Sequence, residues 1–510
     1  MTTVNNNRIA KNTLLLYFRM LFIMAISFYT TRVVLETLGV DDFGIFNVVG
    51  GVVSMLAFFN SSMATSTQRF LNYEMGLKNE SALRKVFSNS INAHLLIAVF
   101  AFVVLETAGL WFVYNKLNIP VAQHNSAIWV YQCAVISFIL NIITTPYNAA
   151  IIANERMNIY AYFSVIEGIL KLLIVFLLVW LPISNKLKLY AILLLIVTAI
   201  IQALYAIYCI CHFNECRYEF SWDLGLIKQL FSFTGWMLFG CISNMLSTQG
   251  VSILINLFYG VVFNASRAIA VQIQQAINTF VTNFMTAVKP QIIKSYAAGE
   301  KQQMYRLVFS SSKLSYYLLF VLSLPVLLYT EYILKIWLGQ VPEYCVIFTR
   351  LVLVDLLINS VYTPIAQVNQ ASGRIRNYQL SISTLYLLVF VITYIVYKLG
   401  SPVYSTFIIS IIISFLGLFV RIYILKKEDA FPAEGYVKEV ILPLVPVSLC
   451  ALIIPISLYL LLDISLMTFI INVAACLACS IVCIWKLGLN IQERSFVFDQ
   501  IKNVCARLKR

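Results

Sequence analysis

The sequence carries very little charge for its length. Only 11% of its 510 residues are charged, while 61% are hydrophobic; soluble domains carry about 25% charged residues. A soluble fold of this length would have too little polar surface to cover its apolar core. The composition therefore excludes a soluble globular protein and predicts an all-α polytopic membrane protein.

Long polar segments are also scarce. The longest are 212–230, 289–307, 426–439 and the tail from Lys486, and none is long enough to fold as a soluble domain. The histidines His94, His124 and His212 are scattered along the chain. We therefore expect no catalytic residues, no cofactor and no metal site. A membrane-embedded polysaccharide polymerase is the least favoured alternative, because such enzymes need a sizeable loop with acid and base residues.

The 11 cysteines lie mostly within apolar stretches, where cysteine behaves as a small hydrophobic residue. A tighter group, Cys209, Cys211, His212 and Cys216, matches no zinc-binding spacing. The sequence thus favours packing cysteines over metal ligands or disulfides.

Apolar segments long enough to span a bilayer occur about fourteen times, since a span needs about 20 mostly apolar residues. The first contains Arg19 and is too long for a signal peptide, so it is interpreted as a spanning helix. The predicted spans lie near 12–38, 43–67, 90–114, 126–152, 159–181, 189–211, 231–258, 262–288, 308–330, 345–370, 378–398, 403–425, 440–462 and 464–485.

The basic residues predict the orientation of these spans. If the N-terminus is cytoplasmic and the loops alternate, 26 of the 36 Lys and Arg residues fall on the inner side, Arg421 among them, and five on the outer side. Such a bias is the positive-inside pattern of membrane proteins. The net charge of +14 thus reports topology, with some attraction to bilayer lipids, and we expect no nucleic-acid partner. Both termini are predicted to be cytoplasmic.

The sequence repeats itself. Residues 145–160, TPYNAAIIANERMNIY, align without gaps with residues 363–378, TPIAQVNQASGRIRNY. Gly39-Val40 and Gly260-Val261 form a second match, and Phe87-Ser88 and Phe309-Ser310 form a third, at similar offsets. We therefore predict two parallel six-helix lobes, as in many transporters. The predicted divisions are lobes 1–211 and 231–425, a cytoplasmic linker 212–230, two additional helices in 426–485, and a basic cytoplasmic tail 486–510.

Charged residues inside the predicted spans are candidates for function, because each costs about 2.5–3.5 kcal/mol at the bilayer centre on insertion scales. Guanidinium groups suit an anionic cargo, since they bind phosphate oxygens in a bidentate fork. The predicted substrate-binding cations are Arg19, Arg32, Arg267 and Arg350. Arg32 has Glu36 four residues away, and Glu167 has Lys171, so mutual neutralisation is an equal alternative for these pairs.

Neutral polar residues accompany these arginines. On the segment that begins at Arg267 they recur on one helical face. The predicted polar lining of a water-filled cavity is Gln274, Gln275, Asn278, Asn244 and Asn60. Hydrogen bonding between helices is the less favoured alternative. Asp355 and Glu167 are candidates for ion coupling, although Asp355 could instead neutralise Arg350.

The opening stretch 8–51 contains a helix that ends at Leu38-Gly39, followed by Asp42-Phe43-Gly44. With twelve helices in two parallel halves plus two more, it resembles the multidrug/oligosaccharidyl-lipid/polysaccharide exporter superfamily, and within it the bacterial polysaccharide (O-antigen type) flippases.

The resemblance implies a flippase that moves a polyprenyl-diphosphate-linked oligosaccharide to the outer leaflet by alternating access, for cell-surface polysaccharide assembly. It implies a place in the bacterial inner membrane, beside other polysaccharide-assembly membrane proteins. The main alternative is a cation-coupled multidrug exporter of the same superfamily, which would need uncompensated carboxylates in its cavity.

Overall fold

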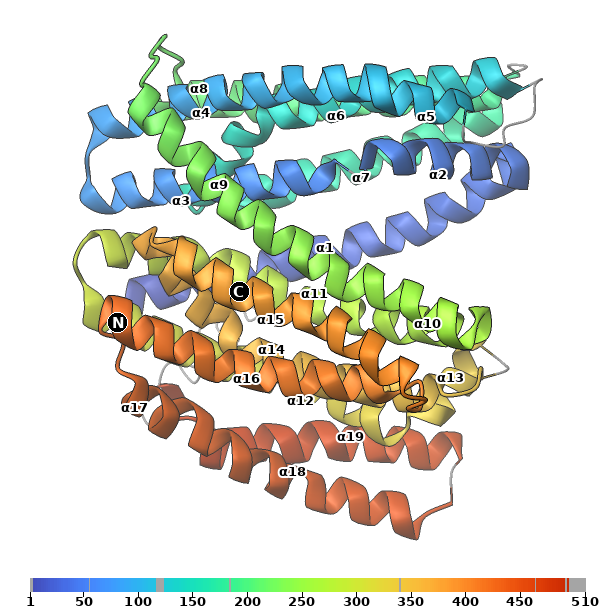
Figure 1. Ribbon diagram of the computed structural model, residues 1–510, viewed down its shortest axis with the longest axis vertical. Helices are drawn as coiled ribbons and strands as arrows, with labels where there is room; N and C mark the ends of the chain where they lie inside the picture. The colour runs from blue at the N-terminus through green and yellow to red at the C-terminus, as the bar shows by residue number, and fades with distance from the viewer. Residues whose placement is uncertain are drawn as a thin grey trace, which may run out of the picture. The chain divides into compact units, whose positions relative to one another are not determined.

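The computed structural model describes residues 3–54, 56–115, 123–182, 185–338, 341–463, 465–490 and 493–494. Throughout this part of the chain the regular structure is helical, without strands (Figure 1). Where the structure describes them, the fourteen predicted apolar segments lie almost wholly in helices, and eleven helices of described residues are long and apolar enough to cross a membrane. The all-α polytopic fold is therefore confirmed. The predicted tail beyond residue 494 lies outside the described residues.

The chain divides into two compact units. The N-terminal unit is Lys11–Leu238, and the C-terminal unit is Phe239–Arg510 together with Met1–Ala10. Helices of the N-terminal unit are α1 (Thr3–Leu38, from Lys11 on), α2 (Val40–Ser54), α3 (Ala57–Leu77), α4 (Glu80–Val104), η1 (Leu105–Gly109), α5 (Leu110–Asn115), α6 (His124–Ala153), α7 (Met157–Trp180), α8 (Lys186–His212), η3 (Asn214–Cys216) and the first part of α9 (Leu224–Met245).

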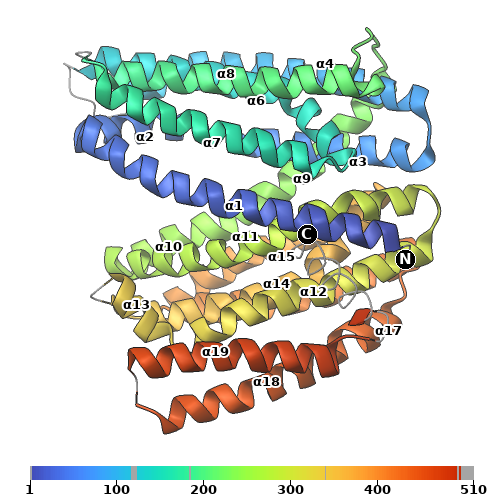
Figure 2. The ribbon, with the colours of Figure 1, turned by 180° about the vertical axis from the view of Figure 1, so that it is seen from behind.

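The C-terminal unit continues α9 and ends in a pair of antiparallel helices. Its further helices are η4 (Leu246–Gly250), α10 (Val251–Tyr259), α11 (Val261–Ala297), α12 (Lys301–Leu328), α13 (Thr330–Leu338), α14 (Cys345–Ser372), α15 (Ile375–Lys398), α16 (Ser405–Asp429), α17 (Ala433–Tyr436), η5 (Val437–Ile441), α18 (Leu442–Leu461), α19 (Leu466–Cys483) and η6 (Ile484–Gly488). Helices α18 and α19 pack against each other and against α12 (Figure 2).

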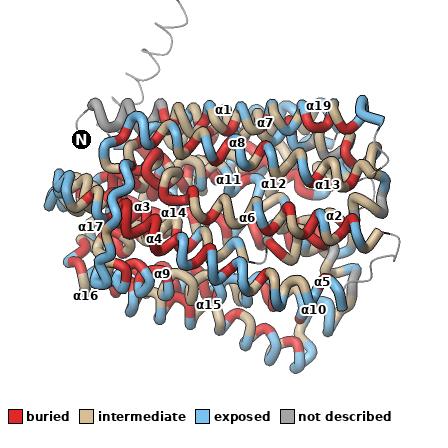
Figure 3. The backbone as a smooth tube through the Cα atoms, turned by 90° about the horizontal axis from the view of Figure 1, so that it is seen from above, coloured by how far each residue is buried: buried red, intermediate tan, exposed pale blue. Residues whose placement is uncertain are grey.

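One central helix organises each unit. In the N-terminal unit α6 packs against α3, α4 and α8; in the C-terminal unit α14 packs against α11, α12 and α16. Both central helices contain a proline, Pro146 and Pro364, at positions that the sequence repeat aligns. Figure 3 shows buried stretches in red along α3 and α14. The two units thus repeat one packing scheme, as the internal repeat predicts.

Breaks in the helices are closed by side chains from neighbouring helices. A π turn disturbs the regular hydrogen-bond ladder, and the backbone groups that it frees need protein partners where water is absent. The hydroxyl of Tyr131 on α6 donates to the Leu105 carbonyl at η1, at 2.5 Å. Nη2 of Arg267 on α11 donates to the Thr248 carbonyl in η4, at 2.7 Å.

A buried ion pair fixes the segment after α19 to the C-terminal unit. Lys313 on α12 is only 4% exposed, and its Nζ lies 2.7 Å from Oε2 of Glu493. The Ser310 hydroxyl donates to the other Glu493 oxygen, at 3.0 Å. A charge this deep is stable because the partner and the hydrogen bonds replace its hydration.

Candidate functional site

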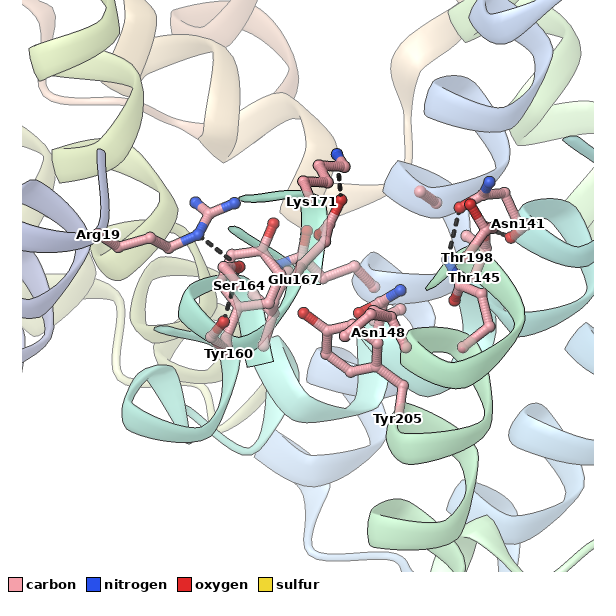
Figure 4. A pocket seen from close by; sticks show the side chains of 16 residues that line it. Arg19, Asn141, Thr145, Asn148, Tyr160, Ser164, Glu167, Lys171, Thr198 and Tyr205 are labelled. Carbon is pink, nitrogen blue, oxygen red and sulfur yellow. Dashed lines mark hydrogen bonds and ion pairs between the residues drawn. The ribbon is translucent and has the colours of Figure 1, made fainter. Parts of the chain in front are cut away.

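A polar cavity of about 510 Å³ lies within the N-terminal unit. It is enclosed by side chains from α1, α3, α6, α7 and α8, and Figure 4 shows how they converge. Its lining is Arg19, Ala64, Gln68, Asn141, Thr145, Asn148, Ala149, Ile152, Tyr160, Ser164, Glu167, Lys171, Thr198, Ile201, Gln202 and Tyr205. Amides, hydroxyls and two aromatic rings predominate, so the cavity can offer hydrogen bonds and flat apolar surfaces together.

Arg19 on α1 is held at one edge of this cavity by α7. Its Nε donates to the Ser164 hydroxyl at 2.7 Å, and its guanidinium carbon lies 4.4 Å from the centroid of the Tyr160 ring. Ser164 in turn donates to the Tyr160 carbonyl, one helical turn earlier. Among the described residues no carboxylate pairs with Arg19. Its two Nη groups point away from Ser164 in Figure 4 and remain available for an anion.

The carboxylate in the cavity wall is already neutralised. Glu167 on α7 accepts from Nζ of Lys171 on the next turn, at 2.6 Å. This is the mutual pairing that the spacing of four residues allows. Because the two charges cancel, the net positive charge of the lining comes from Arg19.

A network of amides and hydroxyls builds the wall that α3, α6 and α8 share. Nε2 of Gln202 donates to Oδ1 of Asn141, while the Thr144 hydroxyl donates to Oε1 of Gln202. The Thr145 hydroxyl lies 2.7 Å from Oδ1 of Asn60, which places the predicted lining residue Asn60 directly behind the wall. Such linked side chains fix one another's orientation, as a specific binding surface requires.

The cavity also contains an unused acceptor. Oδ1 of Asn148 on α6 is buried and has no hydrogen-bond partner in the described part of the chain. Buried polar atoms are normally paired, and an unpaired one costs about 1–3 kcal/mol. A ligand hydroxyl in the cavity would satisfy it.

Two of the predicted arginines belong to the C-terminal unit and stabilise interrupted helices there. Arg267 binds the Thr248 carbonyl of η4, and its Nε is buried without a hydrogen-bond partner among the described residues. Nε of Arg350 donates to the Leu327 carbonyl near the end of α12, at 3.1 Å, and approaches the Thr330 hydroxyl. Neither forms an ion pair with a described acid, and their assignment to substrate stays a prediction.

Asp355 on α14 forms no ion pair with Arg350 in the described part of the chain. Nδ2 of Asn359 donates to its Oδ2, at 2.9 Å, while its Oδ1 is buried without a hydrogen-bond partner in the described residues. The hydroxyl of Ser414 on α16 also approaches this carboxylate. Glu167, the other predicted ion-coupling residue, is paired with Lys171 instead.

The predicted polar stripe of α11 lies on the surface of the C-terminal unit. Gln275, Asn278 and Thr282 are exposed, and Gln274 is half-buried. Asn244 on α9 is exposed as well. The threonines bond to their own helix, as Thr282 does to the Asn278 carbonyl, so these side chains are not used to pack this unit. The side chain of Arg32 lies outside the described residues.

Arg421 is a basic residue whose burial the sequence does not reveal. The topology prediction counts it on the cytoplasmic side, and its side chain is buried in the C-terminal unit, with 3% exposed. Its Nε donates to the Tyr378 hydroxyl and its Nη2 to the Tyr386 hydroxyl, both at 3.0 Å. Its guanidinium carbon lies 3.6 Å from the centre of the Tyr362 ring. Three tyrosines therefore solvate this cation.

Most of the N-terminal cavity was not predicted. Neutral residues such as Asn141, Ser164 and Gln202 carry no charge that would mark them within a span. The internal repeat is the feature of the sequence that could have pointed to these residues. Asn141, Thr145 and Tyr160 recur in the second half as Asn359, Thr363 and Tyr378. Asn141, Thr145 and Tyr160 all line the cavity.

The fold is shared with membrane transporters of known structure. An outward-facing multidrug resistance MATE family transporter of the MOP superfamily aligns with a TM-score of 0.68 at 12% identity, over 82% of this chain and 96% of that one. A MOP superfamily transporter from Pyrococcus furiosus gives 0.66 at 12% identity, over 86% and 99%. A MATE structure in complex with MaD3S gives 0.70 at 12% identity, over 83% and 97%. The fold is therefore that of the MOP-superfamily transporters.

A family model then places the sequence within this class. The model described as polysaccharide biosynthesis protein matches residues 9–296, more than half of the chain. No curated protein sequence matches the chain. The chain belongs to the polysaccharide biosynthesis protein family, and the resemblance carried by residues 8–51 is confirmed.

Proposed function

We propose that this membrane protein is a flippase that moves a polyprenyl-diphosphate-linked oligosaccharide from the cytoplasmic to the outer leaflet by alternating access. Such a step supplies lipid-linked sugar for cell-surface polysaccharides such as O-antigen and lipopolysaccharide. The assignment to the bacterial inner membrane, with both termini cytoplasmic, is part of this proposal. Family membership supports the link to polysaccharide, and the fold supports transport.

The observation that carries the proposal is the arginine at the edge of the N-terminal cavity. Arg19 is held by a hydrogen bond from its Nε to Ser164 and by stacking on the Tyr160 ring. Its two Nη groups are therefore oriented, but neither of these contacts occupies them. A guanidinium stays charged and binds phosphate or carboxylate oxygens in a fork. In a cavity whose other charges cancel, this arrangement selects an anion.

The rest of the lining suits a sugar. Asn141, Asn148 and Gln202 supply amides that can exchange hydrogen bonds with ring hydroxyls, and Tyr160 and Tyr205 supply flat apolar faces. Polar groups that are already oriented by a network lose little entropy when a ligand binds. We therefore assign the cavity to the anionic, sugar-bearing head of the cargo.

Outward movement of this cargo does not require ion coupling. A diphosphate carries about two negative charges, and moving charge across the membrane is worth about 2.3 kcal/mol per charge per 100 mV. With a negative interior, the anion therefore moves outward downhill. If a cation is coupled, Asp355 is the carboxylate we assign to it, because it has only neutral hydrogen-bond partners among the described residues, whereas Glu167 is paired with Lys171.

A cation exporter is the second candidate, favoured by one observation. Glu167 lines the cavity, and MATE transporters share the fold. Its pairing with Lys171 at 2.6 Å argues against a free anionic site, so a cationic drug would have to break that pair before binding.

Sidedness of the lipid-linked sugar tests the proposal. Cells that lack the gene should accumulate the lipid-linked oligosaccharide on the cytoplasmic side of the inner membrane. Re-expression of the wild-type chain should restore its outer-leaflet pool, whereas Arg19→Ala should not. The proposal fails if sidedness is unchanged in the deletion strain. Loss of resistance to a cationic dye, with normal sidedness, would favour the cation exporter.

A further inference from the structure

The segment between α8 and α9 is fixed to the N-terminal unit along its whole length. This strap, residues 213–223, has no regular structure after η3 and runs beside the N-terminal half of α4 (Figures 1 and 2). It begins at a buried residue, Phe213, and Cys216 is fully buried. A hydrogen bond to Cys209 and burial raise the pKa of the Cys216 thiol, which keeps that thiol neutral.

One face of α4 binds the backbone of the strap at alternate residues. The Glu219 N–H donates to the Ser88 hydroxyl, and the Asp223 N–H donates to Oδ1 of Asn89. Between them, Nδ2 of Asn92 donates to the Ser221 carbonyl, at 2.8 Å.

Side chains add two contacts where the strap first reaches α4. Arg84 pairs with Glu219, and the Tyr218 hydroxyl donates to Oδ1 of Asn92. Because successive residues of an extended chain face opposite ways, binding residues 219, 221 and 223 turns the residues between them outward.

The outward residues are large and apolar. Phe220 is 80% exposed, Trp222 48% and Leu224, the first residue of α9, 69%. Hydrogen bonds order this short segment, and yet these apolar side chains are left exposed in a row. We call Phe220, Trp222 and Leu224 the strap ridge.

The position of the strap along α4 indicates what covers the ridge. The exposed apolar side chains of α4 begin at Leu95 and Leu96 and continue through Val99 and Phe100. Asn92, the last α4 residue that binds the strap, is three residues earlier, or about 5 Å along a helix that rises 1.5 Å per residue. The strap therefore lies just beyond the exposed apolar stretch of α4, the position that headgroups take beside a spanning helix.

Charge at the strap points to the same surface. Lys85, Arg217 and Lys228 are exposed around it. Glu219 is paired with Arg84, while Glu215 and Asp223 keep their charge and accept hydrogen bonds from Asn154 and from the first turn of α9. Trp and other amphipathic aromatic residues favour the membrane interface, and exposed Lys and Arg attract anionic lipids.

We propose that the strap is an interfacial anchor, which inserts Phe220 and Trp222 at the boundary between headgroups and acyl chains and uses its basic neighbours to bind anionic lipid. The anchor holds the linker against the N-terminal unit, so the linker is not a slack connection. This role is independent of the cargo.

Fluorescence quenching in a bilayer of stated composition tests the anchor. The full chain is reconstituted into vesicles of phosphatidylcholine and phosphatidylglycerol after Trp111, Trp129, Trp180, Trp236, Trp337 and Trp485 are replaced by Phe, which leaves Trp222. Lipids brominated near the carbonyl end of the acyl chain should remove most of its emission, and aqueous iodide little. The matched control adds Trp222→Phe and Phe213→Trp to the same six replacements, so that its single tryptophan lies at the buried start of the strap, and it should be protected from both quenchers.

Three results would overturn the anchor. Quenching of Trp222 by iodide but not by brominated lipid would place the ridge in water. Protection from both quenchers would show that protein covers it. Equal lipid quenching at positions 213 and 222 would show that the strap is not ordered. If the variant with a single tryptophan does not fold, Trp222→Phe alone is compared with the otherwise unchanged chain. The emission that brominated lipid quenches should be smaller in Trp222→Phe, and the difference measures contact of Trp222 with lipid.

Discussion

The two units place a guanidinium on the same repeated tyrosine, but from different helices and with opposite results. In the N-terminal unit Arg19 of α1 stacks on Tyr160 and keeps its Nη groups free beside a cavity. In the C-terminal unit Arg421 of α16 donates to the equivalent Tyr378 and is closed off by Tyr362 and Tyr386. One unit presents its cation, and the other buries it.

A single position explains why the C-terminal unit lacks an equivalent of Arg19. Arg19 lies 20 residues before Gly39, and Gly240 lies 20 residues before the matching Gly260. A Cβ at Gly240 would lie 2.8 Å from Oε1 of Gln379, so the α15 side chain occupies the space above this glycine. The comparison shows that two copies of one scaffold can place a cation differently. One copy presents it beside a cavity, and the other buries it, where it stabilises the fold.

The largest expected effect is on the buried cation. Arg421→Met should lower the free energy of unfolding of the C-terminal unit by about 3–5 kcal/mol, since it removes two hydrogen bonds from a charged donor and a cation–π contact. The same change at Arg19 should cost far less, because that side chain has one such hydrogen bond and borders a cavity. Thermal unfolding of the two purified variants measures the difference. Equal losses of stability would erase the distinction between the units.

Hydrophobic length and repetition explain why the fold could be predicted. A bilayer span needs about 20 apolar residues, and the repeat around Pro146 and Pro364 aligned the two central helices before any packing was known. Charge counting does not reveal the burial of Arg421, because that burial depends on three tyrosines from α14 and α15 that converge only in the folded unit.

The candidate site could be predicted only in part. Arg19 stood out as a charge without an acid nearby, and Glu167 with Lys171 stood out by spacing. Asn141, Ser164 and Gln202 did not, because Ser, Asn and Gln within a span equally indicate packing between helices. The pair Lys313–Glu493 joins residues that are 180 positions apart, a separation that no local pattern reveals.

The second-largest effect is the loss of stability when an ion pair is broken, which we compare for one pair from each unit. Glu493→Gln should destabilise the C-terminal unit by about 3 kcal/mol, because it leaves Lys313 buried without a counter-charge. Glu167→Gln, in the half-exposed pair with Lys171, should cost only about 0.5 kcal/mol. Thermal unfolding compares the variants, and Lys313→Met combined with Glu493→Gln should recover much of the lost stability. A large loss for Glu167→Gln alone would contradict the assignment.

A smaller effect should appear at the presented cation. Arg19→Lys keeps the charge but loses the planar fork and the stacking on Tyr160, so affinity for a soluble sugar diphosphate should fall about tenfold, or about 1.4 kcal/mol. Titration calorimetry on the detergent-solubilised chain measures it. The matched variant Lys171→Arg, in the neutralised pair, should bind as the wild type does. Undiminished binding by Arg19→Lys would mean that the fork is not used.

The smallest effect concerns the residue that positions Arg19. Ser164→Ala removes the acceptor for Nε and should weaken headgroup binding about threefold, less than one kcal/mol, since the Tyr160 face still orients the guanidinium. The control is Thr198→Val. Thr198 also lines the cavity, but none of the described hydrogen bonds joins it to Arg19. Salt dependence separates the two roles: it should persist in Ser164→Ala, where the charge remains, and it should be lost in Arg19→Ala.

Outward movement of lipid-linked sugar by reconstituted protein tests the central claim most directly. Vesicles that contain the wild-type chain should expose a polyprenyl-diphosphate oligosaccharide to an external sugar-binding probe faster than empty vesicles. Vesicles with Arg19→Ala, folded as judged by an unchanged melting temperature, should expose it no faster than empty ones. Wild-type rates in Arg19→Ala would contradict the account, because the N-terminal cavity would then not hold the anionic cargo.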